Sequence, residues 1–314
     1  MELNMSSTAF VFPGQGSQKL GMGNELAVAY PQAMEIFQKS DEILGFPLSN
    51  ILWEGPEEAL NDTINTQPAL FVHSIASLTV FHTLFPEFKA KFAAGHSMGE
   101  LSALTASGAI PFEEGLLLVR KRGELMKRAG ELSPGSMAAI LGLDIPAVEK
   151  ICLDASIPGD AVQLANDNCP GQVVVSGTKA AVERILPLAK EAGAKRALPL
   201  AVSIAAHSVL MEDAQIDFSK AIAETTINSP EITTIGNVKS KPLSTPSEIR
   251  YDLEAQLTSR VRWTESVDYM VSKGVDTFIE LGSKDILSGL IKRINRKVTR
   301  ISLGTPEDFD KLTQ

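Results

Sequence analysis

The sequence predicts an α/β fold, with a large α/β-hydrolase-like domain built on a mostly parallel sheet and a small inserted ferredoxin-like domain. Three observations lead to this prediction: short apolar runs that stop at glycine-containing turns, helical patterns that alternate with them, and a change of rhythm in the middle of the chain. We expect the large domain to span residues 1–131 and 204–314, and the small domain to span residues 132–203.

The elements of the large domain begin with a buried strand at Ala9–Phe12, which ends at Pro13-Gly14. A second strand is predicted at Phe92–Ala94, directly before a helical pattern. The uncharged stretch from Thr63 to Pro86 predicts a buried helix that starts near Pro68. We do not interpret it as a membrane span, because it carries several polar side chains that are unfavourable in lipid.

The middle of the chain has a different order of elements, β-α-β-β-α-β, which is typical of a ferredoxin-like domain. The loop between its second and third strands is predicted to be the run Asn-Asp-Asn-Cys-Pro-Gly. The six predicted elements are a strand at 136–141, a helix at 145–155, strands at 161–165 and 172–176, a helix at 180–192 and a strand at 196–202.

Composition and charge exclude some classes of function. Of the 314 residues, 44% are hydrophobic and 21% are charged, as expected for a globular protein with a core, and the formal net charge of −9 argues against nucleic-acid binding. Cys152 and Cys169 lack metal-ligand or redox spacing, which favours a reduced, cytoplasmic setting. Met1 to Ala9 have neither the cationic start nor the apolar core of a signal peptide, and we expect no membrane association.

The run Gly95-His96-Ser97-Met98-Gly99 matches the pattern G-x-S-x-G between a predicted strand and a predicted helix. At such a turn the serine hydroxyl is exposed, the glycines permit close backbone approach, and the following helix directs its N–H groups at a developing oxyanion. We therefore predict that Ser97 is a nucleophile; the alternative is an ordinary Gly-Ser turn.

A serine nucleophile needs a general base, and the chain has only four histidines. Neighbours on a sharp turn point apart, which argues against His96, and His73 and His82 lie on the predicted apolar helix as packed or surface residues. His207 follows the inserted domain in a stretch of small residues and is the candidate base, although an unremarkable loop histidine is an equal alternative.

A helix predicted at Phe112–Ala129 places Arg122 on an apolar stripe with Leu118 and Leu125, whereas Arg120 lies on a charged stripe. A guanidinium that points inward is unfavourable unless it meets an anion. Arg122 therefore either forms an internal salt bridge or binds a substrate carboxylate through two parallel hydrogen bonds.

Taken together, these motifs resemble those of the malonyl-CoA:acyl carrier protein transacylases of type II fatty acid synthesis. The similarity extends from about residue 8 to residue 303. It rests on Phe12–Gln18, Gly95–Glu100, Arg122-Gly123, Asn168–Val174 and Phe278–Gly282. The chain departs from the family at Ser259–Trp263, where Asn-Pro-Val often precedes the tryptophan, and at Ser283-Lys284, where Pro-Gly is usual.

The resemblance implies a role for each site residue. Ser97 would be the nucleophile, His207 its base and Arg122 the group that holds the malonyl carboxylate. The backbone N–H groups of Gln15 and Met98 would form the oxyanion hole, and His96 would line the acyl pocket with Met98. The backbone carbonyl of Gln256 would orient the histidine, so that no acidic third member is needed.

The resemblance also implies ping-pong transfer of malonyl from malonyl-CoA to the phosphopantetheine thiol of an acyl carrier protein, with no metal and no cofactor. We expect a monomer. The basic run Lys292, Arg293, Arg296, Lys297 and Arg300 is a candidate docking surface for the carrier protein or simply a solvated helix face.

Three other functions stay open on the sequence alone. A serine hydrolase such as a thioesterase shares G-x-S-x-G, but its histidine normally comes late in the chain, whereas 107 residues follow His207. An acyltransferase for another acyl group is harder to separate, because pocket volume cannot be derived from sequence. The third is a binding protein without catalysis.

Overall fold

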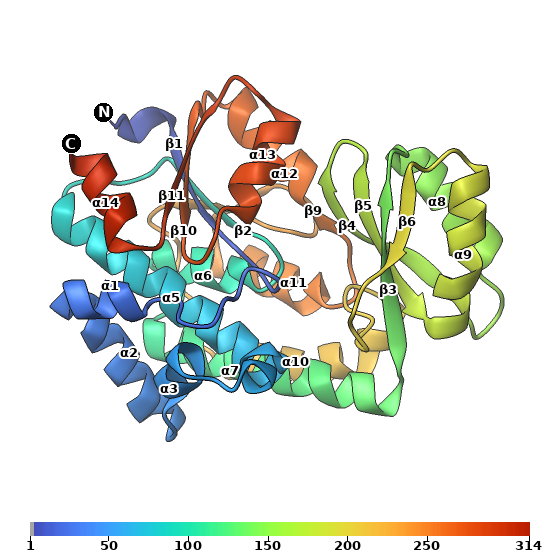
Figure 1. The fold of residues 1–314 in the computed structure, drawn as a ribbon, viewed down its shortest axis with the longest axis horizontal. Coiled ribbons are helices and arrows are strands. Elements are labelled where there is room, and N and C mark those ends of the chain that lie inside the picture. Colours follow the sequence, from blue (N-terminus) through green and yellow to red (C-terminus); the bar gives the residue numbers. More distant parts are fainter. Residues whose placement is uncertain (1–2) are drawn as a thin grey trace.

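The structure is a computed structural model that describes residues 3–314. Its larger sheet has six strands in the order β11-β10-β1-β2-β7-β8, all parallel to their neighbours except β8 (Figure 1). The predicted fold class is confirmed: a mostly parallel sheet and a separate small sheet make up an α/β molecule. The strands of the larger sheet are β1 (Thr8–Phe12), β2 (Phe92–Gly95), β7 (Thr233–Ile235), β8 (Pro242–Leu243), β10 (Thr277–Leu281) and β11 (Thr299–Leu303).

Both faces of the sheet are covered at its centre, which explains why the central strands β1 and β2 carry runs of consecutive apolar residues rather than alternating ones. In β1, Phe10 and Phe12 pack into the main core, whereas Ala9 and Val11 pack into a second cluster under α12 and α13. The helices around the sheet are α1 (Asn24–Ala29), α2 (Pro31–Leu44), α3 (Leu48–Trp53), α4 (Glu57–Asn61), α5 (Thr63–Leu84), α6 (Gly99–Ala106), α7 (Phe112–Leu132), α10 (Glu212–Glu224), α11 (Pro246–Gln256), α12 (Trp263–Ser272), α13 (Ile286–Ile294) and α14 (Pro306–Thr313).

Helix α5 is buried as predicted, but its predicted start near Pro68 is wrong. The helix begins at Thr63, because the Asp62 side chain accepts a hydrogen bond from the N–H of Ile64 and caps it. Proline removes one helical donor, which would leave the carbonyl of Ile64 without a partner. Arg120 Nη1 donates to that carbonyl at 2.9 Å and satisfies it, so the helix continues through Pro68. No helix among residues 3–314 is both long and apolar enough to cross a membrane.

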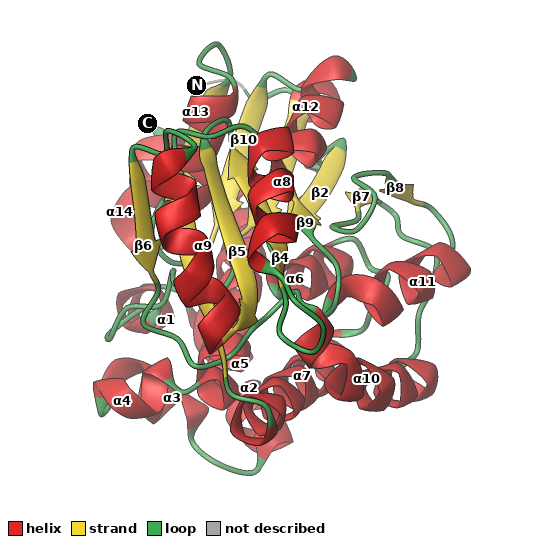
Figure 2. Cartoon of the chain, turned by 90° about the vertical axis from the view of Figure 1, so that its right-hand side faces the viewer, coloured by secondary structure: helices red, strands yellow, loops and turns green. Residues whose placement is uncertain are grey.

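The smaller sheet has the order β6-β3-β5-β4-β9, and α8 and α9 lie side by side across one of its faces (Figure 2). Its first four strands are antiparallel and give the ferredoxin-like arrangement that the sequence predicts. The elements are β3 (Gly135–Leu141), α8 (Ile145–Ala155), β4 (Val162–Cys169), β5 (Gln172–Thr178), α9 (Lys179–Glu191), β6 (Arg196–Pro199) and β9 (Val261–Arg262).

Two details of this sheet differ from the prediction. The last strand ends at Pro199 rather than at residue 202. The Asn-Asp-Asn-Cys run is not a loop: Asn166–Cys169 are buried in β4, and only Pro170-Gly171 form the turn. The physical reason is β9, which pairs in parallel with β4 through Asn166 and Asp167 and comes from outside the predicted small domain. The residue boundaries of the two domains stay a prediction.

Candidate active site

The turn after β2 holds Ser97 in the left-handed region of backbone conformation, at φ 54°. Glycine is required on both sides of it. A Cβ on Gly95 would lie 1.9 Å from the carbonyl of Gly99, and a Cβ on Gly99 would lie 2.2 Å from the carbonyl oxygen of Phe12. The close packing of β1, β2 and α6 therefore forces the tight strand–helix turn that exposes the serine hydroxyl.

Asn237 stabilises this turn, and the sequence analysis missed it. Its Oδ1 accepts the N–H of Ser97 at 2.8 Å, and its Nδ2 donates to the carbonyl of Gly95 at 2.7 Å. Asn237 is buried and follows β7, which is the neighbour of β2 in the sheet. A lone asparagine 140 residues from Ser97 in sequence gives no local signal, so only the strand order could have pointed to it.

Ser97 and His207 lie together, although 110 residues separate them. Ser97 Oγ is 2.8 Å from His207 Nε2, and His207 Nδ1 is 2.9 Å from the carbonyl oxygen of Gln256 and 3.1 Å from that of Ser259. With a proton on Nδ1, the imidazole donates to these carbonyls and presents Nε2 as an acceptor to the hydroxyl. Burial, and then the nearby Arg122 charge, lower the pKa of His207 to about 3, so the ring is a neutral base at neutral pH.

Arg122 is 1% exposed and points into the site from α7. Its Nη2 lies 3.1 Å from Ser97 Oγ and 2.9 Å from Gln256 Oε1, and its Nη1 lies 2.8 Å from Gln67 Oε1. Among residues 3–314 its one other hydrogen-bond partner is Met126 Sδ, which is also neutral, so this guanidinium has no internal salt bridge of the kind left open above. Burial lowers the pKa of Arg122 to about 10, which leaves it charged at neutral pH.

A buried acid, Glu100, lies near Arg122 but forms no direct ion pair with it in the described part of the chain. Glu100 is fully buried, and its carboxyl accepts from the side-chain amide of Gln256 and from the backbone N–H of Asn237. Burial first, and then the charge of Asp252, raise the pKa of Glu100 well above its ordinary value. Gln256 joins this carboxyl to the guanidinium, because its amide nitrogen donates to Glu100 and its amide oxygen accepts from Arg122.

Gln256 uses both its side chain and its backbone. Its Oε1 accepts from Arg122, its Nε2 donates to Glu100 and to the carbonyl of Ser97, and its own carbonyl accepts from His207. One residue at the end of α11 thus fixes the base, the cation and the turn relative to one another. From the resemblance, only the backbone carbonyl was expected to matter.

The two expected oxyanion donors lie at the ends of β1 and β2. The backbone N–H groups of Gln15 and Met98 have no acceptor among residues 3–314. Met98 is buried at the start of α6, and the exposed Gln15 is held through its Oε1 by Thr63 Oγ1 at 2.9 Å. Free backbone donors are what an oxyanion hole requires, and the part of Gln15 and Met98 in it stays a prediction.

The remaining histidines lie outside the Ser97–His207 pair. His96 Nε2 is 2.8 Å from Asn168 Oδ1, and the ring lies with its edge to Trp263, so it contacts the small sheet rather than the serine hydroxyl. Its expected part in binding substrate stays a prediction. His73 is buried against the carbonyl of Gly304, and His82 packs against Phe10.

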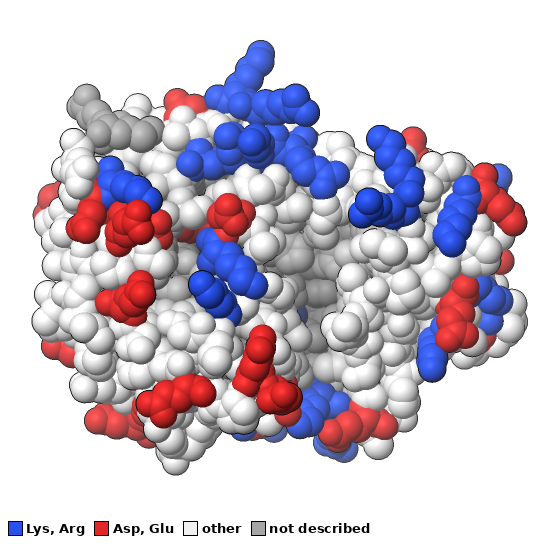
Figure 3. Space-filling view, viewed as in Figure 1, with Lys and Arg blue, Asp and Glu red and all other residues white. Residues whose placement is uncertain are grey.

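Basic side chains gather over α13, above the hollow that separates the two sheets (Figure 3). The expected docking run begins in α13 and continues through the following turn into β11. Lys292, Arg293, Arg296 and Lys297 are exposed and Arg300 is half-buried. None of the five forms an ion pair with an acidic residue among residues 3–314; Arg293 instead donates to Gln172 at the turn of the small sheet.

Comparison with known proteins places these features in a family. The family model described as acyl transferase domain matches residues 9–302. The malonyl CoA-acyl carrier protein transacylase of Bacillus subtilis (strain 168) is 44% identical over 312 residues, which cover 99% of this chain and 97% of that protein. The protein of the same name from Haemophilus influenzae is 44% identical over 310 residues, which cover 99% of each chain.

Solved structures agree with this relationship. An acyl carrier protein S-malonyltransferase from Vibrio cholerae has 43% identity and a TM-score of 0.94, covering 98% of this chain and 100% of that chain. A malonyl-transacylase solved in complex with its type II PKS acyl-carrier protein has 39% identity and a TM-score of 0.94, covering 98% of each chain. The family model, the full-length relatives and the superposable structures together establish that the chain belongs to the acyl transferase family, among the malonyl CoA-acyl carrier protein transacylases.

Proposed function

We propose that this protein transfers a malonyl group from malonyl-CoA to the phosphopantetheine thiol of an acyl carrier protein by a ping-pong, acyl-serine mechanism. One observation carries the proposal: Ser97 Oγ lies 2.8 Å from the neutral base His207 and 3.1 Å from the buried cation Arg122, whose direct partners are all neutral. A hydroxyl between a base and such a cation suits an acyl thioester that ends in a carboxylate.

In the first half-reaction, Ser97 Oγ attacks the thioester carbonyl while its proton passes to His207 Nε2. The backbone N–H groups of Gln15 and Met98 stabilise the tetrahedral oxyanion, each by about 3 kcal/mol of barrier. The carbonyls of Gln256 and Ser259 accept from Nδ1–H and stabilise the imidazolium. The C–S bond then breaks, and the imidazolium returns its proton to the leaving thiolate of coenzyme A.

In the second half-reaction, the carrier's thiol gives its proton to His207 Nε2 and its sulfur attacks the malonyl ester on Ser97. Collapse of this intermediate breaks the ester bond and returns the proton to Ser97 Oγ. No proton or electron is gained or lost over the cycle, so the transfer needs no redox cofactor, and we propose that it proceeds without a metal.

Arg122 is proposed to select the acyl group. It lies close enough to the nucleophile to donate two parallel hydrogen bonds to the free carboxylate of malonyl, whereas acetyl has no such group. An uncharged acyl chain would leave the buried guanidinium unpaired, which is unfavourable. His96 and Met98 are proposed to line the same acyl pocket.

The proposal includes a monomeric, cytoplasmic enzyme. Cys152 and Cys169 are both free and buried, which suits a reducing compartment.

Mass spectrometry of the intact protein, quenched soon after mixing with malonyl-CoA, tests the proposed function. We expect a single malonyl adduct that maps to Ser97 and disappears when holo carrier protein is added, with malonyl-carrier as the product. Release of free malonate at a comparable rate would instead identify a thioesterase. An intact protein without an adduct at any time would contradict acyl transfer altogether.

The pH dependence of kcat/KM provides a second test. The pKa of His207 is lowered, so the neutral base persists as the pH falls, and activity is retained below the ordinary histidine range. Between about pH 8 and pH 5 we expect kcat/KM for malonyl-CoA to change by less than about 2-fold, whereas a base with an ordinary pKa of about 6.5 would lose roughly 30-fold. An acidic limb near the ordinary value would contradict the assigned environment of His207.

A further inference from the structure

The side chain of Gln163, on β4 of the small sheet, reaches across to the loop that carries His207. Its Nε2 donates to the carbonyl oxygen of His207 at 3.1 Å and to that of Thr258 at 3.2 Å. Its Oε1 accepts the backbone N–H of Val209 at 3.2 Å. The amide group of Gln163 thus joins β4 to two other backbone segments, the loop 207–209 and the segment around Thr258.

The backbone of His207 needs such support. Its φ is 59°, a left-handed conformation that is unfavourable for a residue with a side chain by about 1 kcal/mol or more. A conformation of this kind persists only where the surroundings fix it. Gln163 holds the carbonyl of His207 and the N–H of Val209, which lie on either side of Ser208, so it fixes the direction in which the chain leaves His207.

The third contact concerns the acceptors of the imidazole. Thr258 lies between Gln256 and Ser259, whose carbonyls accept from His207 Nδ1. By binding the Thr258 carbonyl and the His207 carbonyl through the same nitrogen, Gln163 ties the histidine backbone to the segment that orients its ring. Displacement of either segment would change the distance between Nε2 and Ser97 Oγ.

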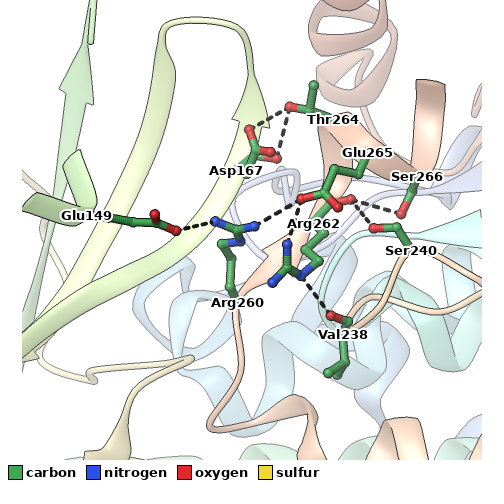
Figure 4. A network of polar contacts seen from close by, with 9 residues as sticks. All are labelled: Glu149, Asp167, Val238, Ser240, Arg260, Arg262, Thr264, Glu265 and Ser266. Carbon is green, nitrogen blue, oxygen red and sulfur yellow. Dashed lines mark hydrogen bonds and ion pairs between the residues drawn. The ribbon is translucent and has the colours of Figure 1, made fainter. Parts of the chain in front are cut away.

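Further contacts fasten the same segment to the small sheet (Figure 4). Arg260 bridges Glu149 of α8 at 3.1 Å and Glu265 of α12 at 3.0 Å, and Thr264 Oγ1 donates to Asp167 of β4 at 2.6 Å. The run that contains Arg260 is one of the two departures from the family pattern. These contacts hold the segment against the small sheet. Among the residues named in this paragraph, only Gln163 contacts the loop that carries His207.

We propose that Gln163 is a positioning residue for His207, through which the small sheet holds the imidazole in line with the serine hydroxyl. This inference rests on the proposed function, because it assigns His207 as the base of the reaction.

Gln163→Ala and the similarly sized Gln163→Met test the inference. In both, the rate constant for formation of the malonyl adduct on Ser97 should fall by roughly 10- to 100-fold, since misplacement of a catalytic group by about 1 Å has an effect of this size. The KM for malonyl-CoA should stay within about 3-fold, because Gln163 does not contact the proposed acyl pocket. The acidic limb of kcat/KM should also move to higher pH, because a displaced imidazole is less buried and lies farther from the Arg122 guanidinium and from the His96 ring, the two basic groups that lower its pKa.

Thr264→Val is the matched control. It removes a hydrogen bond between β4 and the same segment but touches neither His207 nor its acceptors. We expect a lower melting temperature with adduct formation within about 3-fold of the wild-type rate. The inference is overturned if the Gln163 variants retain the wild-type rate, or if Thr264→Val loses as much. A wild-type protein that forms no adduct would instead refute the proposed function, so the two failures are distinguishable.

Discussion

Ser97→Ala is expected to lower malonyl transfer to the carrier protein by at least about 10⁴-fold, because it removes the only group that bonds covalently to the acyl chain. The remaining oxyanion donors and Arg122 would still bind malonyl-CoA, so the KM should change far less than kcat. Steady-state transfer and intact-mass measurements check both points, and the variant should form no malonyl adduct.

Ser102→Ala is a suitable control for this variant. Ser102 lies in the first turn of α6, is fully buried, and its hydroxyl has no hydrogen-bond partner among residues 3–314. Its removal should leave transfer within about 3-fold of wild type, because no catalytic contact is lost. Residual transfer by Ser97→Ala at more than a small fraction of the wild-type rate would mean that the nucleophile lies elsewhere.

Arg122→Ala is expected to lower malonyl transfer by about 10²- to 10⁴-fold, which corresponds to about 3–5 kcal/mol for the loss of one member of a buried ion pair. Acetyl transfer from acetyl-CoA should change by less than about 10-fold, because acetyl has no carboxylate to bind. The ratio of the two kcat/KM values is therefore the decisive quantity, and it should move toward acetyl. Arg122→Lys should lie between, since an ammonium keeps the charge but cannot form two parallel hydrogen bonds.

Arg128→Ala controls for the loss of an arginine from α7. Its side chain is 68% exposed, and its ion pair with Asp217 is long, at 3.8 Å. Such a surface pair contributes little, so neither activity should change measurably. An equal loss of malonyl and acetyl transfer in Arg122→Ala would show that Arg122 maintains the geometry of Ser97 and Gln256 rather than reading the substrate carboxylate.

The elements of the fold were predictable where the signal is local. The apolar run at Ala9–Phe12 and the glycines around Ser97 determine a strand and a sharp turn, because both reflect the preferences of neighbouring residues. Arg122 was placed inward by periodicity alone, since a helical period fixes which residues share a face. The start of α5 was misplaced because a distant group, Arg120, satisfies the carbonyl that Pro68 leaves without a donor.

The candidate site was predictable in part. The serine motif is local and could be recognised directly. For His207, the residues alone favoured a catalytic base and an ordinary loop histidine equally. Only the family resemblance identified it as the base. Nothing in the sequence indicated Asn237, whose contacts with the Ser97 turn depend on β7 lying beside β2. The sequence did not indicate Gln163 either, because its three contacts are with residues 44 to 95 positions away.

The sequence by itself therefore determined the local parts: the strand and helix periods, the turn that exposes Ser97 and the inward face that carries Arg122. Only the tertiary structure decided that the imidazole lies 2.8 Å from the hydroxyl, that Arg122 meets neutral partners instead of a carboxylate, and that β9 joins the small sheet. The physical reason is that backbone preference and periodicity act over a few residues, whereas these contacts form only when strand order and packing bring distant segments together.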